Sequence, residues 1–166
     1  MLNPWTAFIL IVCLIFTPML AAEDPASDRS TATCTFDDQK DVSVQYGAAK
    51  SSERLPNGRV WTPGGKPMFL LTQADLVLEN TPIPVGAYSM FAIPGKNNWT
   101  VIVNRNVDPS GKYDEKQDVA RASMDVGQLS DEEKQFTVVF GHLGPKVCSM
   151  RFYFGKIGAF TEFNER

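Results

Sequence analysis

The stretch that decides the fold is IPVGAYSMFAIPGKNNWTVIVNR, residues 83–105. Pro84 restricts how the chain enters it and Gly86 lets the chain turn, and the extended strand that follows ends at Pro94. A second strand, 99–104, returns alongside the first, so the stretch predicts a β-hairpin. Its apolar residues fall on both faces of the hairpin. We therefore expect these two strands to be central in a sheet and covered on each side.

Other segments of the chain alternate apolar and polar residues with a period of two, which is typical of strands with one face buried. The apolar members, which should point inward, are Val42, Val44, Tyr46, Leu76, Leu78, Ala122, Met124, Val126, Phe136, Val138 and Phe140. Short turn sequences separate these segments. The pattern predicts an all-β domain over residues 31–163, an antiparallel β-sandwich or jelly-roll-like barrel of about eight or nine strands.

Two short segments are predicted to fall outside this pattern. In 128–135, Ser130 precedes acidic residues as a helix N-cap does, which favours one short helical turn. Residues 164–166 are expected to form a tail after the last strand.

The chain has 166 residues and a formal net charge of −3, and this length favours a single domain. Charges of both signs are scattered along it without a basic stripe. Nucleic-acid binding depends on Lys and Arg gathered on one face, so we do not expect DNA or RNA as a partner.

The N-terminus has the pattern of a secretory signal peptide. Residues 1–22 contain no Asp, Glu, Lys or Arg, and an apolar run is followed by a proline and small residues. We expect cleavage between Ala22 and Glu23, a polar linker over 23–30, and a mature protein in the periplasm or outside the cell. The alternative is an uncleaved segment that anchors the protein, and this segment is the one expected contact with a membrane.

Export bears on the cysteines, because a disulfide persists only in an oxidising compartment. Cys34 and Cys148 both alternate with inward-facing residues, so both thiols should point into the core. Either they form a disulfide or they are two separate buried thiols. The sequence contains no CxxC motif and no Cys/His cluster, so we expect neither a metal nor a cofactor.

Two long loops, 48–67 and 104–118, carry the candidate ligand-binding residues. Loops of this length are usually functional or disordered. The candidates on or beside them are Trp61, Asn104, Tyr113 and Arg121. Aromatic and amphipathic side chains of this kind suit a glycan, a peptide or a small apolar ligand.

Trp61 itself has two interpretations. It either packs back on the end of the barrel or forms part of a binding surface, and Tyr113 is its expected neighbour.

The favoured function is a non-catalytic binding or structural module, without assigned catalytic residues. The alternative is a hydrolase-type enzyme that uses carboxylates such as Glu53, Asp114 or Asp118 together with Arg121. An enzyme should place a desolvated carboxylate in a cleft, whereas a binding module should expose an aromatic patch.

The 83–105 stretch also resembles the core signature of the bacterial "domain of unknown function 2911" family. The segments VSVQYG, VWTPGG at 60–65 and YDEKQDVARASM at 113–124 stand in the order that this family has them. The resemblance covers about residues 31–160 and implies an exported, β-rich protein with no assigned activity. Many members have an Arg-Pro pair where this chain reads Gly47, Ala48, Ala49 and Lys50, so a role of that arginine does not carry over.

Overall fold

The structure is a computed structural model that describes residues 29–108 and 110–166. The expected signal segment 1–22, with its cleavage site at Ala22 and Glu23, lies outside the described residues. The described chain shows that the β domain is longer than the expected 31–163, because its first strand begins at Arg29 and its last ends at Glu165. No described helix is long and apolar enough to span a bilayer.

The fold is all-β, as predicted, and consists of one antiparallel sheet of nine strands in the order β1-β2-β3-β6-β7-β8-β9-β4-β5. Two 3₁₀ turns, η2 (Pro63–Gly65) and η3 (Glu115–Gln117), lie in the two long loops. The strands are β1 (Arg29–Thr35), β2 (Asp41–Gly47), β3 (Met68–Thr72), β4 (Leu76–Leu78), β5 (Thr81–Ile83), β6 (Gly86–Ile93), β7 (Asn98–Asn104), β8 (Asp118–Gly144) and β9 (Val147–Glu165).

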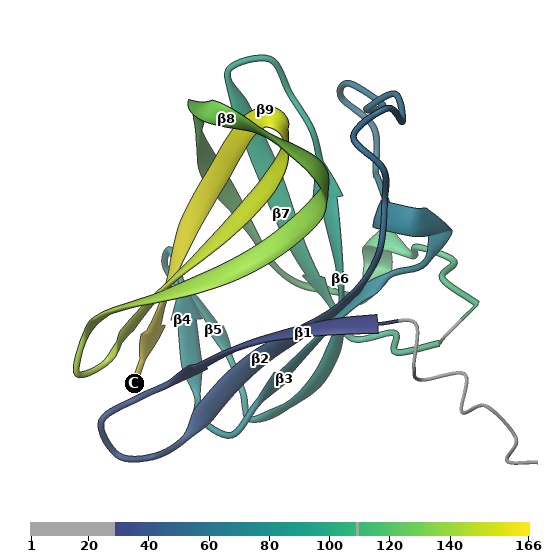
Figure 1. The fold of residues 1–166 in the computed structure, drawn as a ribbon. Coiled ribbons are helices and arrows are strands. Elements are labelled where there is room, and N and C mark those ends of the chain that lie inside the picture. The colour runs from purple at the N-terminus through teal and green to yellow at the C-terminus, as the bar shows by residue number, and fades with distance from the viewer. Residues whose placement is uncertain (1–28, 109) are drawn as a thin grey trace, which may run out of the picture.

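The sheet curls on itself, so that the outer part of the β8–β9 hairpin lies across from β1 and β2 in a sandwich-like arrangement (Figure 1). The chain after β2 closes this contact through its main chain. Phe136 donates its N–H to the carbonyl oxygen of Ala49 at 2.7 Å, and Ser51 donates to Lys134 at 2.9 Å. These bonds pair main-chain groups of Lys134 and Phe136 on one edge of β8.

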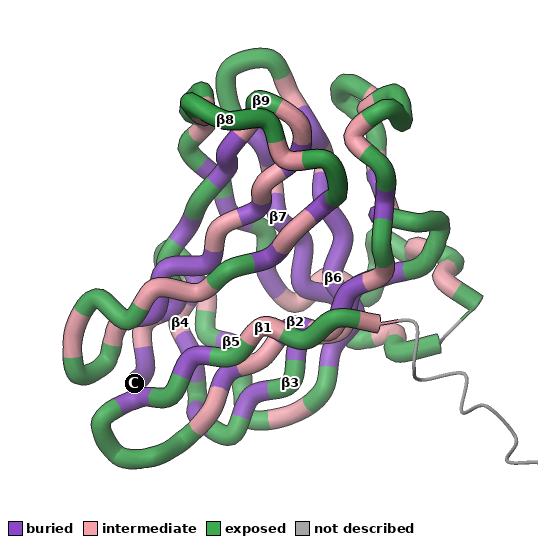
Figure 2. Tube along the Cα trace, in the orientation of Figure 1, coloured by how far each residue is buried: buried purple, intermediate pink, exposed green. Residues whose placement is uncertain are grey.

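The core lies inside the curl, and burial alternates along the strands (Figure 2). Val42, Val44, Leu76 and Leu78 are fully buried, as their period of two predicts. The 83–105 hairpin is formed by β6 and β7 in the middle of the sheet. Both of its faces are covered. Met90 and Ala92 of β6 belong to the main core cluster on one face, and Phe91, which is not part of that cluster, is only 1% exposed on the other face.

The expected helical turn at 128–135 is wrong, because this segment continues β8. The pairing of β8 with β9 continues into this segment, where Gln128 lies opposite Ile157 and Glu133 lies opposite Gly155, with a shift of register between the two pairs. β8 pairs with β9 on one edge and bonds to the chain after β2 on the other. These cross-strand hydrogen bonds outweigh the local preference of Ser130 for an N-cap. Asn164 and Glu165, expected in the tail, belong to β9 and pair with β4.

Cys34 and Cys148 form a disulfide with their Cα atoms 6.3 Å apart. The bond links β1 to the beginning of β9, two strands that are not neighbours in the sheet. It therefore connects the two sides of the curl near the turn of the β8–β9 hairpin.

Candidate functional site

Three of the four candidates from the sequence come together around the carboxylate of Asp118. Asn104 donates from Nδ2 to Oδ1 of Asp118 at 2.7 Å, and Tyr113 donates its hydroxyl to Oδ2, also at 2.7 Å. Arg121 donates from Nε to the same Oδ2 at 2.7 Å and forms a salt bridge with Glu115 at 3.0 Å. We call these five side chains the Asp118 network.

The Asp118 network holds the 104–118 loop over the outer face of the sheet. The ring of Tyr113 packs edge-on against Phe91 of β6, with centroids 5.0 Å apart. Burial, followed by the hydrogen bond to Asp118, raises the pKa of Tyr113 to about 12. Its hydroxyl therefore keeps its proton and remains a donor at neutral pH. This loop explains why Phe91 is buried on the side away from the core.

The carboxylates of the hydrolase alternative are engaged in local contacts. Asp118 accepts three side-chain hydrogen bonds in the Asp118 network. Asp114 caps η3 by accepting from the main-chain N–H of Lys116 at 3.1 Å, and Glu53 accepts from the N–H of Lys50 at 3.1 Å. In residues 29–108 and 110–166 no three His, Cys, Asp or Glu side chains form a group that could hold a metal ion.

Trp61 lies in the core and away from Tyr113, so the expected contact between them is wrong. Its main chain pairs with Ala92 of β6, and the residue is 7% exposed. Because Phe91 and Ala92 point to opposite faces of β6, Tyr113 and Trp61 lie on opposite sides of the sheet. The ring of Trp61 makes edge-on contacts inside the core with Trp99, Phe136 and Phe154.

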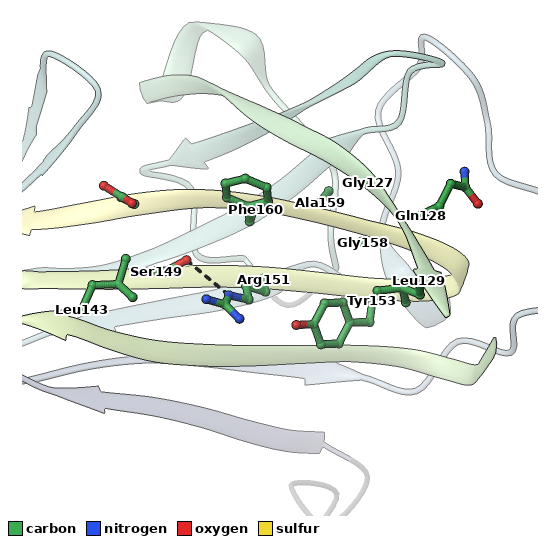
Figure 3. A pocket seen from close by; sticks show the side chains of 11 residues that line it. Gly127, Gln128, Leu129, Leu143, Ser149, Arg151, Tyr153, Gly158, Ala159 and Phe160 are labelled. Carbon is green, nitrogen blue, oxygen red and sulfur yellow. Dashed lines mark hydrogen bonds between the residues drawn. The ribbon is translucent and has the colours of Figure 1, made fainter. Parts of the chain in front are cut away.

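An apolar hollow lies elsewhere, between the two halves of β9 (Figure 3). We call 147–154 the first arm and 157–165 the second arm. The arms join at a bend around Gly155, whose φ of 59° is left-handed. At their other ends the N–H of Glu165 donates to the carbonyl oxygen of Lys146 at 2.8 Å. The space between them, the β9 groove, has a volume of about 310 Å³.

The walls of the β9 groove are mainly apolar. They are formed by Leu129, Leu143, Tyr153 and Phe160. Leu143 and Phe160 remain 53% and 43% exposed, although burying such side chains is favourable. At the bend, a Cβ on Gly158 would lie 3.5 Å from the ring of Tyr153 and 3.1 Å from Leu129, so a glycine keeps the two arms close there.

One cation lies in this apolar groove. Figure 3 shows Arg151 on the first arm among the residues that line the groove, with its guanidinium beside Gly141 of β8. Its Nε lies 3.5 Å from the hydroxyl oxygen of Ser149, which is a long contact. Among the described residues no carboxylate forms a salt bridge with Arg151. Its guanidinium can therefore donate hydrogen bonds to a ligand.

A second, polar hollow adjoins the β9 groove and shares Phe160 and Glu162 with it. It also contains Glu79 and Asp125, and we call it the acidic hollow. One oxygen of Glu79 accepts a hydrogen bond from the N–H of Ser123 at 2.7 Å. None of the three carboxylates forms a salt bridge within the described part of the chain.

Sequence reasoning missed both hollows, because their residues come from β4–β5, β8 and the two arms of β9. The available signal was the pair Gly155 and Gly158 inside an otherwise apolar strand, since a glycine there often marks a bend or a close approach. Three of the polar candidates, Asn104, Tyr113 and Arg121, do lie together in space. Their observed contacts, however, are with one another and with the loop that they hold.

A family model described as "Protein of unknown function (DUF2911)" matches residues 27–160. No curated protein and no solved structure matched the chain. The match spans the 83–105 hairpin, the Asp118 network and most of the β9 groove. This chain therefore belongs to the DUF2911 family of proteins of unknown function.

Proposed function

We propose that this protein is an exported, non-catalytic binding module whose ligand site is the β9 groove. The observation that carries the proposal is the groove itself, a concave space of about 310 Å³ with exposed apolar walls. Small-ligand sites combine such walls with a few polar groups that orient the ligand, and Arg151 and Ser149 are groups of this kind here. Export is supported by the sequence of residues 1–22 and by the disulfide.

The binding role is preferred to the hydrolase alternative because of where the carboxylates lie. A general acid or base must reach the substrate, and Glu53, Asp114 and Asp118 already accept the hydrogen bonds described above. The β9 groove offers apolar area without a paired acid and base. Binding an apolar group against Leu143 and Phe160 would remove both side chains from water.

The test is an NMR titration with neutral single-ring aromatic fragments, following main-chain amide signals. Saturable shifts are expected at Leu129, Tyr153 and Gly158. Leu143→Ser should weaken binding about tenfold, because roughly 1.5 kcal/mol of apolar burial is lost. Val85→Ser is the matched control, since Val85 is 56% exposed and lies outside the groove. Shifts confined to other parts of the surface, or none at all, would overturn the proposal.

A further inference from the structure

We infer that the β9 groove and the acidic hollow together bind an extended peptide segment in which a Lys or Arg stands two positions from an apolar residue. The inference rests on the proposed function and names the ligand class for the same site. It follows from four features of the described residues: the adjacency of the two hollows, the charge of the acidic hollow, the strand edges beside them, and the two-residue spacing along β9.

The two hollows adjoin, because Phe160 and Glu162 line both. These residues lie two positions apart on the second arm of β9, so their side chains leave the same face of the strand. The apolar walls of the groove lie on one side of Phe160 and the acidic hollow lies on the other. A single ligand can therefore occupy both spaces only if it is apolar at one point and cationic at the next.

The charge of the acidic hollow favours a cation. Glu79, Asp125 and Glu162 line one space of about 410 Å³, and no salt bridge within the described residues neutralises any of them. Carboxylates that share a hollow repel one another, and a bound ammonium or guanidinium group would relieve that repulsion. Phe160, 43% exposed at the boundary, can also contact the cation with the face of its ring.

The strand edges favour a peptide over a free amine. Between Cys148 and Glu162, the described pairings give β9 a partner strand on one edge, β8, and β4 pairs only with its last three residues. The edges of the two arms face each other where Glu165 bonds to Lys146. Unpaired main-chain groups on a strand edge are a template for the main chain of an extended peptide.

Phe160 and Glu162, the two residues that both hollows share, are two positions apart in the second arm, as alternate side chains of an extended peptide are. Residues two positions apart in a strand lie on the same face, separated by about 7 Å. A peptide running along β9 would place an apolar side chain in the groove and a basic side chain in the neighbouring hollow. Arg151 would donate hydrogen bonds to the carbonyl oxygens of the peptide, which need a donor once they leave water.

The experiment uses two blocked peptides, Ac-KSFSK-NH₂ and Ac-ESFSE-NH₂, titrated into the protein by calorimetry. The lysine peptide should bind at least tenfold more tightly than the glutamate peptide at 50 mM NaCl. Its advantage should shrink at 500 mM NaCl, because salt screens the charges. The double variant Asp125→Asn, Glu162→Gln should lower the affinity for the lysine peptide at least tenfold.

The matched control is Asp131→Asn, Glu132→Gln, which removes the same charge from exposed residues of β8 outside both hollows. This variant should bind the lysine peptide as the wild type does, and an equal loss in the control would overturn the inference. Equal affinity for the two peptides would also overturn it, as would 2-phenylethylamine binding as tightly as the lysine peptide. If neutral fragments still bind the groove in those cases, the proposed function stands and only the peptide assignment fails.

Discussion

Trp61 shows how one residue in a long polar loop can belong to the core. Its indole meets Trp99, Phe136 and Phe154 edge-on, at centroid distances of 5.9, 5.3 and 5.3 Å. Such contacts add to the free energy gained by burying the ring. Ordering the glycines of this loop costs conformational entropy, and the burial of Trp61 in the core offsets that cost.

Trp61→Ala should lower the free energy of unfolding by about 3–5 kcal/mol, the cost of truncating a large side chain in a packed core. Urea unfolding followed by far-ultraviolet circular dichroism measures it without depending on the fluorescence of the lost ring. Val60→Ala, at the half-buried neighbouring position, is the control and should cost much less. A loss near 1 kcal/mol for Trp61→Ala would instead indicate a loosely held lid.

At the scale of elements, the bend of β9 determines whether the groove exists. Gly155 has a φ of 59°, and a Cβ there would meet no atom closer than Ser51 at 4.0 Å. Space is thus available, but the backbone conformation disfavours any residue with a Cβ. The bend depends on the glycine for its dihedral angle and not for its size.

Gly155→Ala should therefore destabilise the protein by about 1–2 kcal/mol, the cost of a left-handed conformation for an L-residue. Gly127→Ala is the matched control, because a Cβ at Gly127 meets nothing within 4 Å and its φ is not in the left-handed region. That control should be neutral or slightly stabilising in the same denaturant titration. Equal losses in both variants would contradict a role for the dihedral angle at the bend.

For the whole molecule, the Cys34–Cys148 disulfide joins residues 114 positions apart in the sequence. A crosslink that closes so long a loop restricts the unfolded chain strongly. It also connects β1 to β9 across the curl, where the sheet order provides no pairing.

The double variant Cys34→Ala, Cys148→Ala should lose about 4–5 kcal/mol of unfolding free energy, as the chain-entropy model gives for a loop of this length. Guanidinium unfolding of the wild type with and without reductant checks the same quantity. Reductant should leave the double variant unaffected. Rapid alkylation of both thiols in the native, unreduced protein would contradict the bond itself.

The burial of single strands could be predicted from the sequence, because the direction of a side chain along a strand depends on local geometry. Val42, Val44, Leu76 and Leu78 alternate in the sequence and are buried in the structure. The 83–105 hairpin was likewise predictable, since proline and glycine limit where its strands begin and end. The candidate site was predictable only in part: Asn104, Tyr113 and Arg121 do meet, around Asp118.

Contacts between segments distant in the sequence determined the conformation of 128–135, the position of Trp61 and the β9 groove. Ser130 and the acidic residues after it favour a helical turn locally, but pairing with β9 extends the strand through them. The neighbours of Trp61 come from β7, β8 and β9, so its place in the core could not be read from its own loop. The β9 groove arises where one strand folds back on itself, and only the tertiary structure places Phe160 and Arg151 in the lining of one groove. Periodicity along a chain determines which face a residue occupies, whereas a binding site depends on which faces the completed sheet brings together.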